Sequence, residues 1–134
     1  EFRHDHIGYN YRMPNINAAL GCAQLENLDR YVADKRETAA CYAEFFKGKE
    51  DITFFTEPAD CKSNYWLNAV VLKDKAAQLD FLEYTNDHGV MTRPVWELMN
   101  RLLMFEHCET DGLENTEWLA DRVVNIPSSV RLDK

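Results

Sequence analysis

The longest regular pattern in the chain covers residues 15–47, where apolar side chains mostly recur at helical spacing and predict one long helix. Pro14 stands at its start, and Gly48 is well placed to end it. The first half, residues 16–28, is rich in alanine and leucine and carries few charges. Because several sides of this half are apolar, we expect it to be buried against another domain or subunit.

Two β-strands are predicted after this helix. Residues 52–55 and 65–72 are rich in β-branched and aromatic side chains, which fit a pleated sheet. A polar stretch that includes Pro58, Asp60 and Asn64 separates them and predicts a turn.

A shorter helical pattern covers residues 74–88, with Leu79 and Leu82 expected to face inward and Phe81 as a further candidate. Residues 90–92 then predict a short strand.

The last part of the chain begins with an irregular or short helical stretch over residues 96–108. A helix is predicted for residues 115–122 with Asn115 as its N-cap, and residues 123–126 are predicted as a final strand. This order of elements predicts an α+β fold, in which a small, mostly antiparallel sheet carries helices on one face.

The composition is that of one soluble globular domain, with 46% apolar and 28% charged residues in a chain of 134. No apolar run is long enough to span a bilayer, so no membrane partner is expected. The net charge of −8 disfavours a nucleic-acid surface, because such surfaces need cations that neutralise phosphates. Near the start, however, Arg3, His4, His6 and Arg12 make the chain locally basic, so a small anion could bind there.

The cysteines indicate reduced thiols in the core or at the surface. Cys22, Cys41, Cys61 and Cys108 are far apart, form no CxxC pair and show no arrangement with histidine at metal-ligand spacing. Free thiols suit a reducing compartment. We therefore expect no bound metal and a cytoplasmic location.

Three blocks carry a more specific arrangement of residues. Residues 8–31 read GYNYRMPNINAALGCAQLENLDRY, residues 89–105 read GVMTRPVWELMNRLLMF, and the block 118–129 ends in NIPSS. Together they resemble the C-terminal part of the DegT/DnrJ/EryC1/StrS family of sugar aminotransferases. Trp96, Asn100 and the NIPSS ending are most similar to the branch that aminates UDP-linked 4-keto-6-deoxy amino sugars, as in legionaminic-acid pathways.

The resemblance implies the small C-terminal domain of a fold-type-I aminotransferase. In that family pyridoxal phosphate forms a Schiff base with a lysine of the large domain, which precedes this region. The lysines here lie in predicted helix ends, loops or charged faces, without the buried setting that imine chemistry needs. We therefore assign no catalytic residue to this chain and expect no pyridoxal phosphate to bind to it alone.

Two residues near the start are candidate cofactor ligands. By its Gly-Tyr-Asn motif, the resemblance places Asn10 against the cofactor phosphate of the other subunit of a dimer, where an amide donates hydrogen bonds without adding charge. The alternative is that Asn10 only caps a turn. Arg12 is the second candidate, with an ion pair to Asp5 or Glu26 as its alternative.

Arg93, Trp96 and Asn100 are the candidate substrate-binding residues, because the resemblance places the second block in a loop that lines the sugar-nucleotide site. A guanidinium fixed before Pro94 can bind a carboxylate of the amino donor or a phosphate of the nucleotide. Trp96 can stack on a sugar or a base. The alternatives are a surface ion pair for Arg93 and a core position for Trp96.

The function implied by the resemblance is amino-group transfer from L-glutamate to a nucleotide-linked 4-keto-6-deoxy sugar in surface polysaccharide biosynthesis, by a homodimer. The expected organisation is an interface segment (1–14), the long helix (15–47) and a small α+β domain (50–134), all part of one C-terminal domain of a longer enzyme. Such a piece is expected to be inactive alone. A non-enzymatic, acidic α+β interaction module is the alternative that the residues leave open.

Overall fold

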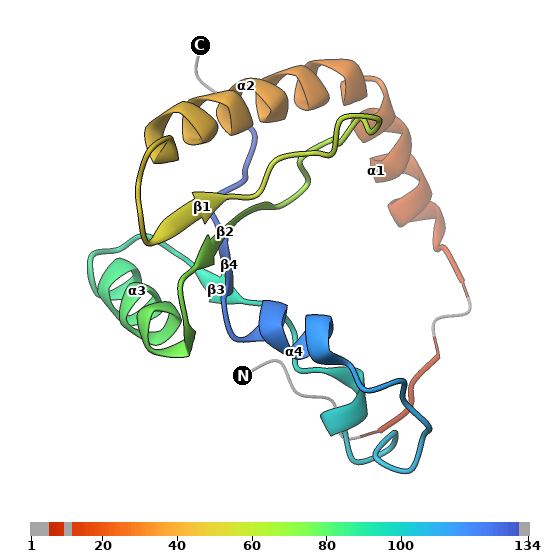
Figure 1. Cartoon of the computed structure of the whole chain (residues 1–134). Coiled ribbons are helices and arrows are strands. Elements are labelled where there is room, and N and C mark those ends of the chain that lie inside the picture. Colours follow the sequence, from red (N-terminus) through yellow and green to blue (C-terminus); the bar gives the residue numbers. More distant parts are fainter. Residues whose placement is uncertain (1–5, 10–11, 132–134) are drawn as a thin grey trace.

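The computed structural model describes residues 6–9 and 12–131 of the chain. Helices α2 (Leu28–Phe46) and α3 (Lys75–Asp87) pack on a four-stranded sheet, and α1 (Asn15–Leu25) extends away from it (Figure 1). This arrangement confirms the predicted α+β fold.

The sheet has the strand order β1-β2-β4-β3, and every neighbouring pair is antiparallel. Its strands are β1 (Ile52–Phe54), β2 (Asn68–Leu72), β3 (Arg93–Pro94) and β4 (Val123–Ile126). At its centre Val70 of β2 lies opposite Val124 of β4, and both are fully buried. The last predicted strand is confirmed with the bounds expected from the sequence.

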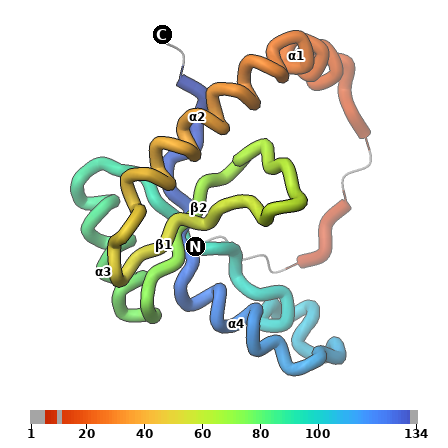
Figure 2. The backbone as a smooth tube through the Cα atoms, turned by 45° about the horizontal axis from the view of Figure 1, so that its top comes forward, coloured from red at the N-terminus to blue at the C-terminus, as the bar shows by residue number. Residues whose placement is uncertain are grey.

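The single long helix predicted for residues 15–47 is wrong, because the chain forms two helices that meet at an angle (Figure 2). Asn27 leaves the helical conformation, with φ −108° and ψ 3°. Its side-chain Nδ2 donates to the Ala23 carbonyl at 3.1 Å, one turn back. Asparagine competes with the backbone in this way, so the apolar pattern continues through a position where the helix itself ends.

The predicted second strand is shorter than expected, since β2 starts only at Asn68. Tyr65 adopts φ +47°, in the left-handed region, and this conformation is incompatible with an extended strand.

The strand predicted for residues 90–92 is also displaced, because β3 consists of Arg93 and Pro94. Thr92 is buried, and its Oγ1 lies 2.6 Å from Thr85 Oγ1 and accepts from Asn86 Nδ2 at 3.0 Å. These bonds hold Thr92 against the end of α3 instead of in the sheet. Pro94 is tolerated in β3 because this is an edge strand.

The core lies between one face of the sheet and the helices α2 and α3. Strand residues at alternate positions supply most of it, which follows from the two-residue period of a strand. Its buried members are Ala39, Phe54, Val70, Leu72, Val124 and Ile126.

Helix α3 is correctly predicted in extent, but its inward face differs from the expected one. Phe81 and Leu82 are partly buried against the core, whereas Leu79 is 54% exposed. The fully buried position is Gln78, which lies one turn before Leu82. The Gln78 amide is satisfied, because Nε2 donates to the carbonyls of Ala120 and Val123 at 3.0 and 2.8 Å.

The stretch predicted as irregular or short helical contains one 3-10 turn, Met99–Arg101. Helix α4 (Glu114–Ala120) follows, and its N-cap is Leu113 rather than the expected Asn115. Leu113 has φ +57°, so the chain enters the helix from a left-handed turn and Asn115 is already inside it.

No helix among the described residues is long and apolar enough to cross a membrane. In the same residues, no group of three or more histidine, cysteine or acidic side chains is arranged to hold a metal ion. All four cysteines are free and exposed, so of the two predicted alternatives they are surface thiols and not core thiols.

Candidate functional site

A cavity of about 520 Å³ is lined by residues of β3, β4, the segment after β3 and the end of α4. Figure 1 shows α4 close to the segment that follows β3. Asn125 of β4 alternates with the core residues Val124 and Ile126. Its side chain therefore lies on the opposite face of the sheet, which α2 and α3 do not cover. Arg93 pairs with Asn125 in register and shares that face. The cavity therefore opens away from the core.

Arg93 and Trp96, two of the three predicted substrate-binding residues, both line this cavity. Trp96 is 55% exposed, so the structure excludes the alternative of a core position. Asn100 lies in the 3-10 turn, half-buried and outside the cavity lining.

Of the two candidate cofactor ligands, the structure describes only Arg12. Arg12 is exposed in the segment before α1 and takes no part in the cavity. Asn10 and His4 fall outside the described residues, and His6 is exposed in the short described stretch 6–9. The cofactor and substrate candidates are therefore not brought together within the described part of this chain.

Several polar residues of the cavity carry no motif that sequence reasoning could use. Lys75, at the start of α3, and Asp121, just after α4, face each other with 3.6 Å between Nζ and Oδ1. Lys75 Nζ also donates to Gln78 Oε1 at 2.7 Å. Lys75 is thus tied to the buried amide that joins α3 to β4. The position of Lys75 at the cavity wall is fixed in part by Asp121, which is far from it in sequence.

Arg101 is another cavity residue that the sequence did not single out. Its guanidinium lies 3.8 Å from Glu97 and 3.6 Å from Glu117. The signals that could have found it are the i,i+4 spacing from Glu97 and its place in the 89–105 block.

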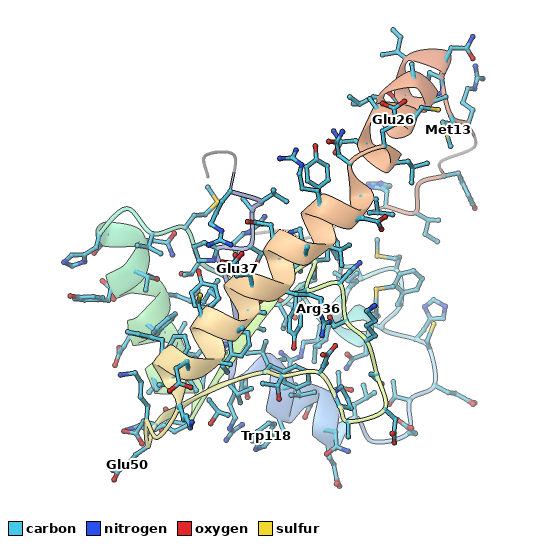
Figure 3. All side chains as sticks on the ribbon, turned by 90° about the horizontal axis from the view of Figure 1, so that it is seen from above. Met13, Glu26, Arg36, Glu37, Glu50 and Trp118 are labelled. Atoms are coloured by element: carbon cyan, nitrogen blue, oxygen red, sulfur yellow. The ribbon has the colours of Figure 1, made fainter. Side chains whose placement is uncertain are left out.

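A second polar cluster shapes the 55–67 loop between β1 and β2. Figure 3 shows Arg36 and Glu37 on opposite sides of α2. Arg36 donates to both carboxylate oxygens of Glu57, at 2.6 and 2.9 Å, and to the Ser63 carbonyl at 2.6 Å. The Arg36 hydrogen bond, followed by the bond from the Ser63 backbone N–H, lowers the pKa of Glu57 to about 2. This cluster holds the loop that leads to Leu67 at the cavity wall.

The NIPSS ending is explained by contacts to α2 and β2. Tyr42 donates its hydroxyl to the Pro127 carbonyl at 3.1 Å, and Lys35 donates to the Ser128 carbonyl. Ser128 Oγ accepts from the Asn68 backbone N–H at 2.7 Å and donates to the Ile126 carbonyl at 2.7 Å. These residues have structural roles, since each bond ties the chain after β4 to the core.

The lysines of the described region do not fit a site for imine formation. None of those between residues 12 and 131 is buried, and the most enclosed, Lys35, is occupied by the carbonyls of Trp66 and Ser128. Imine chemistry needs a lysine whose amine is kept neutral by a buried setting. The described residues can therefore provide a wall and polar contacts but no such lysine.

The architecture is that of a small α+β domain with a cavity on its open sheet face, where an apolar lining carries a few charged side chains. The chain belongs to the DegT/DnrJ/EryC1/StrS aminotransferase family, whose sequence pattern matches residues 1–134.

Two curated relatives show the same relationship. The chain is 31% identical over 130 residues to GDP-perosamine synthase of Escherichia coli O157:H7, covering 96% of this chain and 34% of that protein. It is 30% identical over 133 residues to the putative pyridoxal phosphate-dependent aminotransferase EpsN of Bacillus subtilis, covering 95% and 34%. The chain thus spans about a third of the length of these relatives.

Solved structures share the fold. PseC of Helicobacter pylori, an aminotransferase involved in the biosynthesis of pseudoaminic acid, superposes with a TM-score of 0.81 at 21% identity, over 96% of this chain and 36% of that one. The sugar aminotransferase CalS13 of Micromonospora echinospora gives a TM-score of 0.76 at 26% identity, over 95% and 33%.

Proposed function

We propose that this chain is the C-terminal part of a pyridoxal-phosphate-dependent aminotransferase that moves an amino group from L-glutamate to a nucleotide-linked 4-keto-6-deoxy sugar for surface polysaccharide biosynthesis. The observation that carries the proposal is the family match along residues 1–134. The relatives that are named as a perosamine synthase and as EpsN support it. The same match counts against a non-enzymatic interaction module.

The cavity supports a substrate-binding role for β3 and the segment after it. Arg93 would bind an anionic group of the nucleotide sugar or the amino donor, since a guanidinium fork matches phosphate and carboxylate. The exposed face of Trp96 would stack on a base or sugar ring. Asn100 stays a proposed sugar contact from the adjacent 3-10 turn.

Pyridoxal phosphate would supply the electron sink for amino-group transfer. Asn10 and Arg12 are the residues of this chain that would hold its phosphate, in the active site of a partner subunit, through amide and guanidinium donors. The lysine that binds the cofactor would come from a part of the enzyme outside this chain. Alone, the chain would therefore bind no pyridoxal phosphate and show no activity.

The apolar surface of α1 supports a homodimer. Ile16 is 83% exposed and Leu20 is 61% exposed, and none of the residues of α1 is buried. Exposed apolar surface of this kind marks an interface. We therefore propose that residues 1–14 and α1 contact a partner subunit in a cytoplasmic enzyme.

The branch of the family is proposed from Trp96, Asn100 and the NIPSS ending, which resemble enzymes for UDP-linked sugars of legionaminic-acid-type pathways. The decisive experiment gives the full-length protein pyridoxal phosphate, L-glutamate and a 4-keto-6-deoxy sugar linked to UDP, GDP or dTDP. Mass spectrometry of the sugar nucleotide, with 2-oxoglutarate measured in parallel, reports amino transfer. The proposal expects an aminated product with the UDP-linked sugar. Amination of only the GDP-linked sugar would correct the branch, and amination of none would refute the function.

A further inference from the structure

Arg101 is held more loosely than Lys75, another cation of the cavity. Its carboxylate neighbours, Glu97 and Glu117, lie 3.8 and 3.6 Å away, beyond the 2.7–2.9 Å of a charge-assisted hydrogen bond. Within residues 12–131, no hydrogen bond joins its guanidinium to another group, whereas Arg36 donates to Glu57 at 2.6 and 2.9 Å. Exposed pairs at such distances contribute little free energy, so an incoming anion can displace them.

The second cation, Lys75, is already committed to the fold. Its Nζ donates to Gln78 Oε1 at 2.7 Å and lies 3.6 Å from Asp121. Because Gln78 is fully buried and joins α3 to β4, moving Lys75 would disturb the core. Of these two cations, Arg101 is therefore the one that can change partners without such a cost.

The position of Arg101 complements that of Arg93 on the same cavity. The two arginines flank Trp96 along the chain, and each presents a planar fork of donors that suits one phosphate group. A diphosphate has two such groups, and an attached base has a flat face that can stack on Trp96. The volume, about 520 Å³, is within the roughly 300–1,000 Å³ typical of ligand clefts.

We propose that Arg101 is a substrate-binding residue that holds the diphosphate of the nucleotide sugar together with Arg93, after exchanging Glu97 and Glu117 for phosphate oxygens. The proposal rests on the proposed function, because it assumes that the cavity takes a nucleotide-linked substrate. It adds Arg101 to the residues that the family resemblance indicated. Glu97 and Glu117 would hold the Arg101 guanidinium near the cavity until phosphate oxygens replace them.

The test measures binding of UDP and GDP to the full-length enzyme by calorimetry. Arg101→Gln should weaken binding about tenfold or more, which corresponds to about 1.4 kcal/mol. Arg101→Lys should fall between Arg101→Gln and wild type, because it keeps the charge but loses the fork. Glu117→Gln should tighten binding, because it removes a competing carboxylate. Lys49→Gln, an equal charge change at an exposed residue beyond the end of α2, should match wild type.

Steady-state kinetics separate this inference from the function on which it rests. If wild type transfers the amino group, Arg101→Gln should raise KM for the nucleotide sugar and leave kcat nearly unchanged. If Arg101→Gln instead binds both diphosphates as tightly as Lys49→Gln while wild type is active, the role of Arg101 is overturned and the proposed function stands. A wild-type enzyme that neither binds a nucleoside diphosphate nor transfers an amino group overturns both.

Discussion

Asp34 of α2 binds Arg131, which lies 97 positions later in the sequence, through both of its carboxylate oxygens. Oδ2 accepts from the Arg131 backbone N–H at 3.0 Å, and Oδ1 accepts from Arg131 Nε at 3.0 Å. Asp34 is buried, so these bonds compensate a carboxylate that has lost contact with water. They tie the end of the chain to the helix that covers the sheet.

Replacing Asp34 should therefore loosen this connection. We expect Asp34→Ala to lower the thermal midpoint of unfolding by several degrees, measured by circular dichroism. The matched control is Glu37→Ala, since Glu37 also contacts Arg131, at 3.1 Å, but is about half exposed. Exposed pairs contribute little, so the control should shift the midpoint by much less. Equal shifts in the two variants would contradict a special role for Asp34.

The Arg36–Glu57 pair makes a prediction about pH. The hydrogen bond from Arg36, followed by that from the Ser63 backbone N–H, lowers the pKa of Glu57 from 4.5 to about 2 in the folded chain. A lowered folded-state pKa adds stability that is fully present above about pH 4.5 and is lost as the pH falls toward 2. The thermal midpoint of wild type should therefore drop more steeply between pH 4.5 and 2 than that of Glu57→Gln. Parallel pH profiles of the two proteins would show that the pair contributes nothing to acid stability.

Gln78 and Leu79 are neighbours, but replacing them with alanine should change the stability of the fold by very different amounts. Gln78→Ala leaves the carbonyls of Ala120 and Val123 without their donor and should cost about 1–3 kcal/mol of unfolding free energy. Leu79→Ala, at an exposed position, should stay within about 0.5 kcal/mol of wild type. Urea denaturation measures both. A larger loss for Leu79→Ala would mean that α3 turns its apolar side inward, as the sequence pattern first predicted.

Strand β4 and the helix break at Asn27 illustrate what the sequence can and cannot predict about the fold. Strand β4 was predicted with its observed bounds, because a β-branched run stopped by Pro127 leaves little choice. The apolar pattern does not indicate the break at Asn27, because helical spacing continues across both helices while a local side-chain bond ends the first one. The spacing of apolar residues indicates which side chains are expected to be buried, but it does not indicate where the backbone changes direction.

The candidate site likewise contains some residues that the sequence indicates and others that only the fold shows. Arg93 and Trp96 were singled out because they stand in one sequence block, and the structure places both at the cavity. Lys75 stands outside that block and could not be found in that way, because α3 and the segment after β3 meet at the cavity only in the folded chain. Arg101 stands in the block, but it is the folded chain that shows it lining the same cavity as Arg93 and Trp96. The roles of Arg93 and Trp96 stay predictions until the full-length enzyme is tested.

The exposed apolar side of α1 predicts self-association. At high concentration the chain should form dimers or larger species, because Ile16 and Leu20 would otherwise remain in contact with water. Leu20→Glu should shift the distribution toward monomer, as measured by sedimentation velocity. Leu79→Glu, an equal substitution on the exposed side of α3, is the matched control and should leave the distribution unchanged. A wild-type chain that stays monomeric at high concentration would argue against α1 as an interface.

Asn10 gives the sharpest prediction about the cofactor in the full-length enzyme. If its amide holds the phosphate of pyridoxal phosphate in the partner subunit, Asn10→Ala removes a hydrogen bond to a charged group. Such a bond contributes about 1.5–3 kcal/mol, so cofactor retention should weaken roughly ten- to a hundredfold while the fold persists. Absorbance of the protein-bound cofactor, followed through extended dialysis, measures this loss directly.

Two contrasting variants make the result specific to Asn10. Trp96→Ala should raise the Michaelis constant for the sugar nucleotide without accelerating cofactor loss, because Trp96 lines the cavity proposed for the sugar nucleotide and Arg12 does not. Arg12→Ala should weaken retention only if its guanidinium adds to the phosphate site, and otherwise should act through the dimer. If Asn10→Ala keeps pyridoxal phosphate as long as wild type does, then the phosphate role is wrong and Asn10 is a turn residue.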